Sequence, residues 1–446
     1  MYEEFNLIMS AFLLISGVYF TYITRFVQFC DARGIFRSML GRGVRQHSGV
    51  TPFEALSTAL AGSVGTGNIA GVASALAIGG PGALFWMWIS ALLGMATKYL
   101  EVVLAVRYRT VNKRAERVGG AMYCIKYGMD KRFGFMAVLF CIFGMGAALG
   151  AGNMVQVNTI AAAVSEATGV SAPMVDITVG AIVAVAVAVI TFGGLNRITH
   201  ATAMLVPFMS ILYIVATLTV IIPNISVLPE MFMLIMRSAF GTLRPAAGGI
   251  AGFTFIQTLK CGVIRGVFTH EAGMGSSPIA HASAECTAKA QGMLGIVEVF
   301  VDTMVLCTLT GFMILCSGVP IPYGNMDADG MNIAGAALAT AFSGFARPFL
   351  AVSIMLFAFT AILGWSFYGV RCAEFLLPDK WVWVYRAVFI LCLIIGAPMR
   401  VSAVWRVGET LDSLMALPNI IMMMVLGPKV CAAVGARGKL CYNNRV

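Results

Sequence analysis

Long apolar runs separated by short polar stretches occupy most of this 446-residue chain. An α-helix rises about 1.5 Å per residue, so about 20 apolar residues cross the roughly 30 Å hydrocarbon core of a bilayer. The pattern therefore predicts an all-α polytopic membrane protein, with eleven spanning helices in a single membrane domain. The predicted spans are residues 5–28, 53–77, 83–107, 133–164, 174–191, 200–222, 247–268, 290–317, 346–370, 381–397 and 408–428.

The second predicted span is interrupted in its middle by small and polar residues. Four glycines lie there within ten residues, in the sequence Gly62-Ser63-Val64-Gly65-Thr66-Gly67-Asn68-Ile69-Ala70-Gly71. Each glycine destabilises a helix interior by about 1 kcal/mol relative to alanine, so we expect the helix to open at Gly65-Thr66-Gly67. A helix broken at mid-membrane offers free amides to a carboxylate and free carbonyls to a cation. The alternative is that these small residues let two helices pack closely.

The seventh predicted span has the same character. Its glycines at 248, 249 and 252 precede Thr254, Gln257 and Thr258 in the middle of the span. A second interrupted helix five segments after the first is expected of two inverted repeats of five helices, here segments 2–6 and 7–11. This organisation divides the domain into an extra helix and cytoplasmic loop (1–51), a first repeat (52–222), a second repeat (246–428) and a basic cytoplasmic tail (429–446).

The fourth predicted span contains three amide side chains within six residues, Asn153, Gln156 and Asn158. Gly152 lies four residues before Gln156, so the two share a helical face and a small residue stands beside a candidate ligand. The alternative is that these amides form hydrogen bonds between helices, which contribute about 0.6 kcal/mol each on average. We leave both interpretations open for the asparagines and favour the binding role for Gln156.

In the ninth predicted span, Thr360 and Trp365 share one face by helical spacing. A hydroxyl near the middle of the membrane suits Na⁺, because hard cations prefer oxygen ligands. Trp365 would then cap a small apolar side chain. The alternative for both residues is ordinary packing between helices.

Two acids of the eighth predicted span, Glu298 and Asp302, are four residues apart and therefore share a helical face. Acids inside a membrane are functional candidates that need a partner. Neutralisation by Lys260 or Arg265 is the structural interpretation, which we prefer slightly. Coupling of transport to a proton or a cation is the alternative.

Further charged residues accompany the third and seventh spans. We expect Lys98 and Glu101 to form an internal ion pair. The polar sequel of the seventh span, which contains His270, Glu271 and His281, is too polar for lipid, so we expect it on the cytoplasmic side, with a re-entrant loop as an option. These three residues invite a metal or catalytic interpretation, but we favour a structural role in the loop.

The composition supports the membrane class. Apolar residues make up 59% and charged residues 11% of the chain, whereas a soluble domain carries about 25% charged residues. The formal net charge of +10 falls in a few loops, so we expect a lipid bilayer and no nucleic acid as partner. Lys and Arg concentrate in residues 29–51, 107–132 and 429–446, as is typical of cytoplasmic loops. We therefore expect the amino terminus outside the cell and the carboxy terminus inside, as an odd number of spans requires.

Four stretches, residues 58–73, 152–158, 265–282 and 363–369, resemble signatures of the alanine or glycine:cation symporter family. The resemblance covers essentially the whole chain, although the family often has Ser-Asn-Glu-Ala where this chain has Thr-His-Glu-Ala at 269–272. It implies the leucine-transporter fold in a prokaryotic plasma membrane. It also implies inward symport of a small neutral amino acid, alanine or glycine, by alternating access, with Na⁺ as the coupling ion, no organic cofactor and no enzymatic activity.

The resemblance also assigns roles to residues by their position in the motifs. The backbone of the first helix break and the side chain of Asn68 would bind the substrate carboxylate, and four side chains would shape the remaining pocket. The implied substrate residues are Gly65, Thr66, Gly67, Asn68, Gln156, Phe253, Gln257 and Trp365. The implied sodium ligands are the carbonyls of Ala61 and Val64 and the hydroxyl of Thr360.

Other functions stay open at this point. A proton-coupled transporter of the same fold would rely on Glu298 or Asp302 in place of Thr360. A channel would need a continuous pore, and a membrane enzyme would need a nucleophile or a metal site. For zinc, His270 and its polar neighbours offer no third ligand at a suitable spacing. Binding distinguishes one methylene by only about 1–3 kcal/mol, so the sequence does not decide between alanine and glycine.

Overall fold

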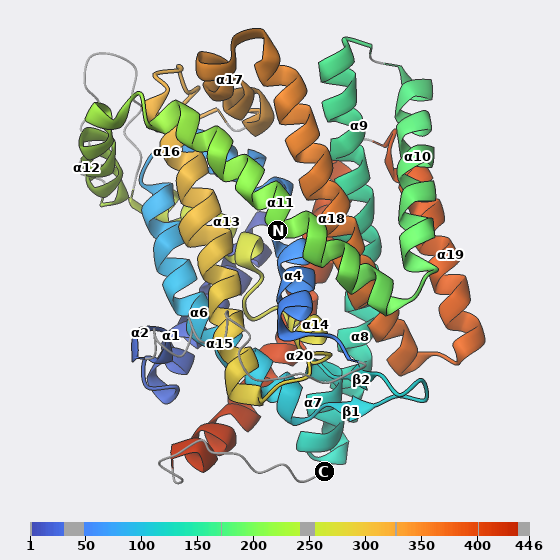
Figure 1. The fold of residues 1–446 in the computed structure, drawn as a ribbon. Helices are drawn as coiled ribbons and strands as arrows, with labels where there is room; N and C mark the ends of the chain where they lie inside the picture. Colours follow the sequence, from blue (N-terminus) through green and yellow to red (C-terminus); the bar gives the residue numbers. More distant parts are fainter. Residues whose placement is uncertain are drawn as a thin grey trace.

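The computed structural model of the chain is a bundle of helices (Figure 1). It describes residues 2–30, 49–170, 172–240, 255–325, 328–399 and 401–435. Within these ranges the strands are β1 (Thr110–Val111) and β2 (Arg117–Val118), which pair antiparallel as a short hairpin. The all-α class predicted from the apolar runs is therefore confirmed for the part of the chain described.

The helices take up most of the described residues. In chain order they are α1 (Tyr2–Ile23), α2 (Val27–Cys30), α4 (Pro52–Ser63), α5 (Ala70–Gly79), α6 (Ala83–Arg107), α7 (Ala121–Gly128), α8 (Gly134–Leu149), α9 (Val155–Thr168), α10 (Pro173–Thr191), α11 (Leu195–Ile221), α12 (Leu228–Ala239), α13 (Phe255–His270), α14 (Pro278–His281), α15 (Ala288–Val299), α16 (Thr308–Cys316), α17 (Gly330–Phe342), α18 (Ala346–Leu376), α19 (Asp379–Gly396) and α20 (Val401–Gly435). Three short turns matter for the site: the 3₁₀ turn η1 (Thr66–Asn68), and the π-helical turns η3 (Gly150–Met154) and η5 (Phe300–Cys307).

Seven helical stretches of the described chain are long and apolar enough to cross a membrane. They are Ala83–Arg107, Lys131–Thr168, Pro173–Thr191, Leu195–Ile221, Ala288–Cys316, Gly330–Leu376 and Arg406–Ala432. Each coincides with one of the eleven predicted spans. The other four predicted spans coincide with α1, with the pair α4 and α5, with α13 and with α19, which are not among the seven. The multi-pass organisation is confirmed, and the count of eleven stays a prediction.

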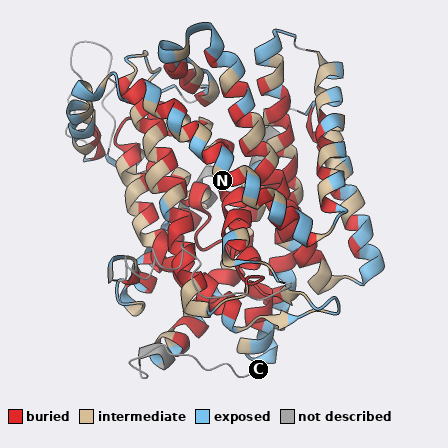
Figure 2. Ribbon diagram, in the orientation of Figure 1, coloured by how far each residue is buried: buried red, intermediate tan, exposed pale blue. Residues whose placement is uncertain are grey.

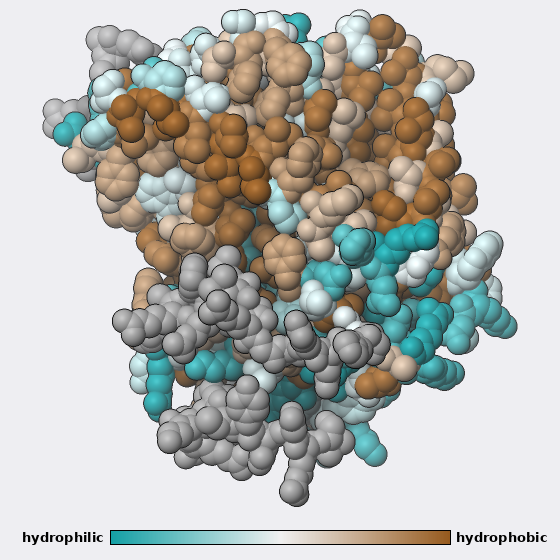
Figure 3. All heavy atoms as spheres, in the orientation of Figure 1, coloured by the Kyte–Doolittle hydropathy of each residue, from teal (hydrophilic) through white to brown (hydrophobic). Residues whose placement is uncertain are grey.

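The surface and the interior divide as expected of a protein in a bilayer. Figure 3 shows apolar side chains over the upper part of the visible face and hydrophilic side chains below, beside the hairpin. Buried residues gather along the axis of the bundle (Figure 2). In α18, every residue from Thr360 to Ala373 is buried. A helix that is buried on all sides belongs to the core of the bundle, and α18 forms one wall of the site described below.

The start of α4 is fixed by a local signal in the sequence. The Thr51 hydroxyl accepts from the amide of Glu54 at 3.2 Å, and the Glu54 carboxylate accepts from the amide of Thr51 at 2.8 Å. This capping box, with Pro52 in the first turn, defines where the helix begins. The twelve residues of α4 span about 18 Å, which brings its end deep into the bundle.

Candidate functional site

The helix predicted to open at Gly65-Thr66-Gly67 is broken there. Helix α4 ends at Ser63, the backbone of Val64 and Gly65 is extended, and α5 begins only at Ala70 after the turn η1. The Gly65 amide donates to Oδ1 of Asn68 at 2.9 Å, and the Asn68 amide donates to the Gly65 carbonyl at 3.2 Å. The helical ladder is thus replaced by a tight local turn, and the predicted interruption is confirmed.

Asn68 holds this turn against a distant part of the chain. Its side chain is fully buried, and Nδ2 donates to Oδ1 of Asp302 at 2.8 Å and to the Asp302 carbonyl at 3.1 Å. The other carboxylate oxygen of Asp302 accepts from the Thr303 hydroxyl at 2.8 Å. Asn68 was assigned to the substrate carboxylate, but the structure directs its side chain toward η5.

A cavity of about 80 Å³ lies beside the broken helix. Its wall combines α4 and η1 with residues of η3, α9, α13, α18 and α20. The lining residues are Gly62, Ser63, Gly65, Thr66, Gly67, Ala151, Val155, Gln156, Arg265, Phe268, Thr269, Glu271, Trp365, Glu409 and Asp412. The structure therefore brings together five of the eight implied substrate residues: Gly65, Thr66, Gly67, Gln156 and Trp365.

Contacts with two residues of η3, Ala151 and Gly152, position Gln156 and Trp365 at the cavity. The Gln156 side chain donates to the carbonyl of Ala151 at 3.2 Å, and its oxygen accepts from the Thr66 hydroxyl at 3.5 Å. The indole of Trp365 lies directly against Gly152, where a Cβ atom would collide with the ring. Glycine at 152 is therefore required for the close approach of α18, as the small residue beside Gln156 suggested.

Helix α18 also packs tightly against the end of α4. A Cβ atom on Gly364 would lie 2.6 Å from the backbone nitrogen of Gly62, so the two backbones touch. The implied sodium ligands Ala61 and Val64 are fully buried at this contact. The Thr360 hydroxyl donates within its own helix, with the carbonyl of Phe357 at 2.9 Å. Thr360 lies one helical turn before Gly364 in α18, and its hydroxyl also contacts Sδ of Met209 at 3.1 Å.

Besides Asn68, the implied substrate residue Gln257 does not line the cavity. Gln257 lies near the start of α13, where its side chain donates to the carbonyl of Ile78 at 3.0 Å. It precedes the cavity residue Phe268 by eleven positions, or about 16 Å along the helix. Phe253 lies outside the described residues. Phe268 and Thr269 line the cavity without having been predicted to, although both belong to the motif at 265–282.

The second interruption described in the structure follows α13. The helix ends at His270, and Glu271, Gly273 and Gly275 adopt left-handed backbone conformations with φ of 50°, 93° and 87°. Helix α14 then begins at Pro278, and the whole stretch between the two helices is buried. The interruption was predicted at the glycines before Thr254, which lie outside the described residues. The stretch was expected on the cytoplasmic side, with a re-entrant course as an option, and its burial favours a course that enters the protein.

The polar groups of this buried loop have partners inside the protein. The Ser276 hydroxyl donates to the Glu271 carboxylate at 2.5 Å. His270 accepts from the amide of Ala272 at Nδ1 (3.1 Å), so Nε2 carries the proton donated to the Ser90 hydroxyl at 3.0 Å. The favoured structural role of His270 is thereby supported. Among the described residues, no three His, Cys, Asp or Glu side chains gather in a way that would hold a metal ion.

Lys98 of α6 is the central charge of the interior. Its ammonium donates to the carbonyl of Glu271 at 3.1 Å and to the Ser277 hydroxyl at 2.6 Å. It lies 3.8 Å from the Glu101 carboxylate and 3.4 Å from that of Glu298. The predicted pair with Glu101 is confirmed. Lys98 thus neutralises buried acids and holds the second helix interruption at once.

The prediction that Lys260 or Arg265 neutralises Glu298 was wrong. Its carboxylate pairs with Lys98 and with His281, whose Nε2 lies 2.9 Å from it, and not with Lys260 or Arg265. The Gln291 amide donates to Nδ1 of His281 at 2.6 Å, so Nε2 carries the donated proton. The reason is packing: α6 lies against both α13 and α15, which brings Lys98 to an acid 200 positions away.

The asparagines of the fourth span form hydrogen bonds between helices. Asn153 donates to the carbonyl of Phe389 at 2.7 Å, and Asn158 donates to the carbonyl of Met399 at 2.7 Å. Both acceptors belong to α19 or to the residues that follow it. The packing alternative therefore accounts for these two amides, while Gln156 faces the cavity.

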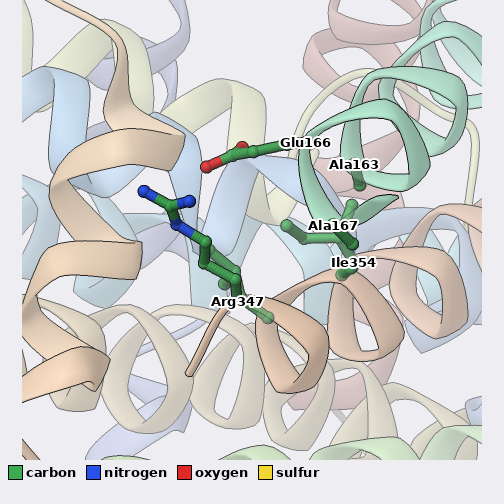
Figure 4. A pocket seen from close by; sticks show the side chains of 7 residues that line it. Ala163, Glu166, Ala167, Arg347 and Ile354 are labelled. Atoms are coloured by element: carbon green, nitrogen blue, oxygen red, sulfur yellow. The ribbon is translucent and has the colours of Figure 1, made fainter. Parts of the chain in front are cut away.

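A second, much smaller pocket of about 10 Å³ lies between α9 and α18. In Figure 4 the carboxylate of Glu166 and the guanidinium of Arg347 point toward each other across it. No residue of either helix interruption lines this pocket. The cavity beside η1 is therefore the candidate site.

Comparisons with known proteins point to one family. A family model described as the sodium:alanine symporter family matches residues 3–437. The chain is 39% identical over 397 residues to the sodium/alanine symporter AgcS of Methanococcus maripaludis, covering 88% of this chain and 85% of that relative. It is 36% identical over 430 residues to the probable sodium/glutamine symporter GlnT of Bacillus subtilis, covering 95% and 86%.

One solved structure shows the same fold at much lower sequence identity. It is the crystal structure of the Eremococcus coleocola manganese transporter in complex with an aromatic bis-isothiourea-substituted compound. The match has a TM-score of 0.58 and 14% identity, and it covers 90% of this chain and 84% of that one. The bundle described above is therefore the fold of a solved membrane transporter.

Proposed function

Because this chain belongs to the sodium:alanine symporter family, we propose that it imports a small neutral amino acid, alanine or glycine, together with Na⁺. The protein is a multi-pass membrane protein of a transporter family. The observation that carries the proposal is the cavity of about 80 Å³ that opens onto the broken helix between α4 and α5. A cavity of this kind, inside a bundle and beside open backbone, is typical of transporter sites.

The broken helix suits the carboxylate of an amino acid. Thr66 and Gly67 begin the turn η1, and the first amides of a helical turn have no carbonyl of their own turn to bond. Both residues line the cavity. Anions bind at such helix starts because the amides point at the ligand. We assign the substrate carboxylate to these amides, with Asn68 fixing the turn from behind.

The same break frees two carbonyls for Na⁺. In a continued helix the amide of Gly65 would bond the carbonyl of Ala61, and the amide of Asn68 would bond the carbonyl of Val64. Both amides instead take part in the local turn between Gly65 and Asn68. The Thr360 hydroxyl contacts the carbonyl of Phe357 at 2.9 Å and Sδ of Met209 at 3.1 Å, and its oxygen carries lone pairs that a cation could take. We assign Na⁺ to these three oxygens.

Selection for a small substrate follows from the bulky residues of the wall. Trp365 and Phe268 both line the cavity, and Trp365 is held by contact with Gly152 and an edge-on contact with Tyr368. Such a wall excludes large side chains by collision. This favours alanine or glycine over the larger substrate named for the Bacillus subtilis relative.

The transport cycle proposed here is alternating access in an inverted-repeat fold of the leucine-transporter type. Two interruptions support the repeats, one between α4 and α5 and one between α13 and α14. The repeats would comprise segments 2–6 and 7–11, with the amino terminus outside a prokaryotic cell membrane and the carboxy terminus in the cytoplasm. Each Na⁺ entering at a membrane potential of 100 mV would contribute about 2.3 kcal/mol.

Proton coupling is the second candidate, and Asp302 is the residue that favours it. Its carboxylate is fully buried and is joined through Asn68 to the broken helix, so a change of protonation would act on the site directly. Glu298 is less suited, because Lys98 and His281 already hold its charge.

Uptake of labelled alanine and glycine by purified protein in liposomes tests the proposal. An inward Na⁺ gradient is compared with an equal K⁺ gradient and with a pH step that is acid outside. We expect concentrative uptake only with Na⁺. Uptake driven by the pH step alone would move the coupling site to Asp302, and no uptake under any gradient would refute the substrate assignment.

A further inference from the structure

The cavity has an acidic wall that the substrate and sodium assignments do not use. Four of its lining residues carry ionisable side chains: Arg265, Glu271, Glu409 and Asp412. Arg265 lies 3.9 Å from the carboxylate of Glu409. Glu271 accepts a hydrogen bond from the hydroxyl of Ser276. Asp412 is the fourth, and one oxygen of its carboxylate has no hydrogen-bond partner among the described residues.

Asp412 is a buried carboxylate without a partner for one of its oxygens. The residue is only 6% exposed, and Oδ1 is buried with no hydrogen-bond partner in the described chain. The charged side chains that act most strongly on it are Glu271 and Glu409, both acids. Burying an unpaired charge is costly, so a carboxylate kept in such a place takes up either a proton or a cationic ligand.

The position of Asp412 places this acid at the amino-acid cavity. Gly408, one helical turn earlier in α20, lies against η3, where its Cβ would stand 2.7 Å from the backbone nitrogen of Ala151. Ala151 lines the cavity together with Asp412. Residues four apart share a helical face, so the same face of α20 that contacts η3 carries Asp412 to the cavity.

An amino acid at neutral pH is a zwitterion, and its two charged ends need two different binding groups. The helix break supplies amides for the carboxylate but no anion for the ammonium. The cavity is small, so both ends of a bound amino acid contact its lining. Given the proposed function, we infer that Asp412 is the counter-ion of the α-ammonium group of the transported amino acid.

The test measures binding to the purified full-length protein. Labelled alanine is bound at saturating Na⁺ and displaced with unlabelled alanine or with lactate, which carries a hydroxyl group in place of the ammonium. Binding of ²²Na⁺ without alanine is measured separately. The variants are Asp412→Asn and Asp412→Glu. Asp379→Asn is the matched control, because Asp379 is exposed at the start of α19.

Asp412→Asn should weaken alanine binding by about 10- to 100-fold, the usual effect of losing a hydrogen bond to a charged group. Its preference for alanine over lactate should fall by a similar factor. Binding of ²²Na⁺ should be unchanged, and Asp379→Asn should resemble the wild type. The thermal midpoint of Asp412→Asn should not fall, because the substitution removes an unpaired buried charge. A structural role for Asp412 would lower that midpoint without changing the alanine preference.

Three results would overturn the inference. The first is alanine binding by Asp412→Asn within about twofold of the wild type, with lactate still rejected. The second is a loss of ²²Na⁺ binding with an unchanged alanine preference, which would make Asp412 a sodium ligand. If Asp412→Asn does not fold, Asp412→Glu is measured in its place, because it keeps the negative charge. Loss of the alanine preference in Asp412→Glu is the third result. A wild type that binds neither alanine nor glycine would instead refute the proposed function itself.

Discussion

Substitution of Asn68 by alanine should both destabilise the protein and abolish uptake. The side chain accepts one hydrogen bond from the Gly65 amide and donates two to Asp302, one of them to the carboxylate. A hydrogen bond between neutral groups contributes about 0.5–1.5 kcal/mol and one to a charged group about 1.5–3 kcal/mol. The three bonds together correspond to about 2.5–6 kcal/mol. From the sequence alone, Asn68→Ala would abolish uptake without loss of folded protein, so the structure changes that expectation.

The assay is unfolding of the purified protein in a denaturing detergent titration, with sodium-driven alanine uptake measured in parallel. Asn153→Ala is the matched control, because Asn153 is equally buried and donates one hydrogen bond, to a backbone carbonyl. It should lose about 1 kcal/mol. A double-mutant cycle with Asp302→Ala isolates the bond between the two side chains, which should couple by about 1.5–3 kcal/mol. Stability of Asn68→Ala equal to that of the control, or a coupling near zero, would refute the reasoning.

Three further outcomes are expected. Thr360→Val should raise the Na⁺ concentration for half-maximal uptake by about tenfold, and an unchanged sodium dependence would remove Thr360 from the ion site. Gly152→Ala should push Trp365 into the cavity, lowering uptake and costing about 1–3 kcal/mol of stability; normal uptake would contradict the tight contact. Burial alone would raise the pKa of Glu116, but Arg371 at 2.8 Å holds that pKa below its ordinary value. The ion pair therefore stabilises the fold above the ordinary pKa, and the contribution is lost as pH falls through the lowered one. Glu116→Gln should lower the thermal midpoint at neutral pH, and the difference from wild type should vanish as pH falls through the lowered pKa of Glu116; a constant difference would exclude the pair as its cause.

The first helix break could be predicted because its signal is local. Glycines at 65 and 67 within an apolar run mark the place where the ladder fails, whatever surrounds them. The side chain of Asn68 lies in the same stretch, but its direction depends on Asp302, 234 positions away. The position was therefore predictable from spacing, and the role of its side chain was not.

The second interruption shows the opposite case. Its left-handed residues, among them Gly273 and Gly275, lie in a stretch whose polarity is typical of a surface loop. The stretch is buried because Lys98 reaches it from α6, and no pattern near Lys98 indicates that contact. The pair with Glu101 was visible at a spacing of three residues, whereas the pair with Glu298 was not. Glu409 and Asp412 of α20 were not predicted to line the cavity, because their position there also depends on contacts between helices far apart in the sequence.

Because Lys98 contacts only one of the two helix interruptions, we expect the two interruptions to depend differently on the salt concentration of the surrounding solution. Its ammonium is a cation fixed to the chain, and it occupies the second interruption at every salt concentration. Among the described residues, no salt bridge or hydrogen bond places a charged side chain at the carbonyls assigned to Na⁺, so under that assignment the occupancy of the first interruption would follow mass action. A ligand that binds only the folded state adds stability that grows with its concentration. Under the proposed sodium coupling, the gradient across the membrane would act on the first interruption, while Lys98 keeps the second interruption the same at every Na⁺ concentration.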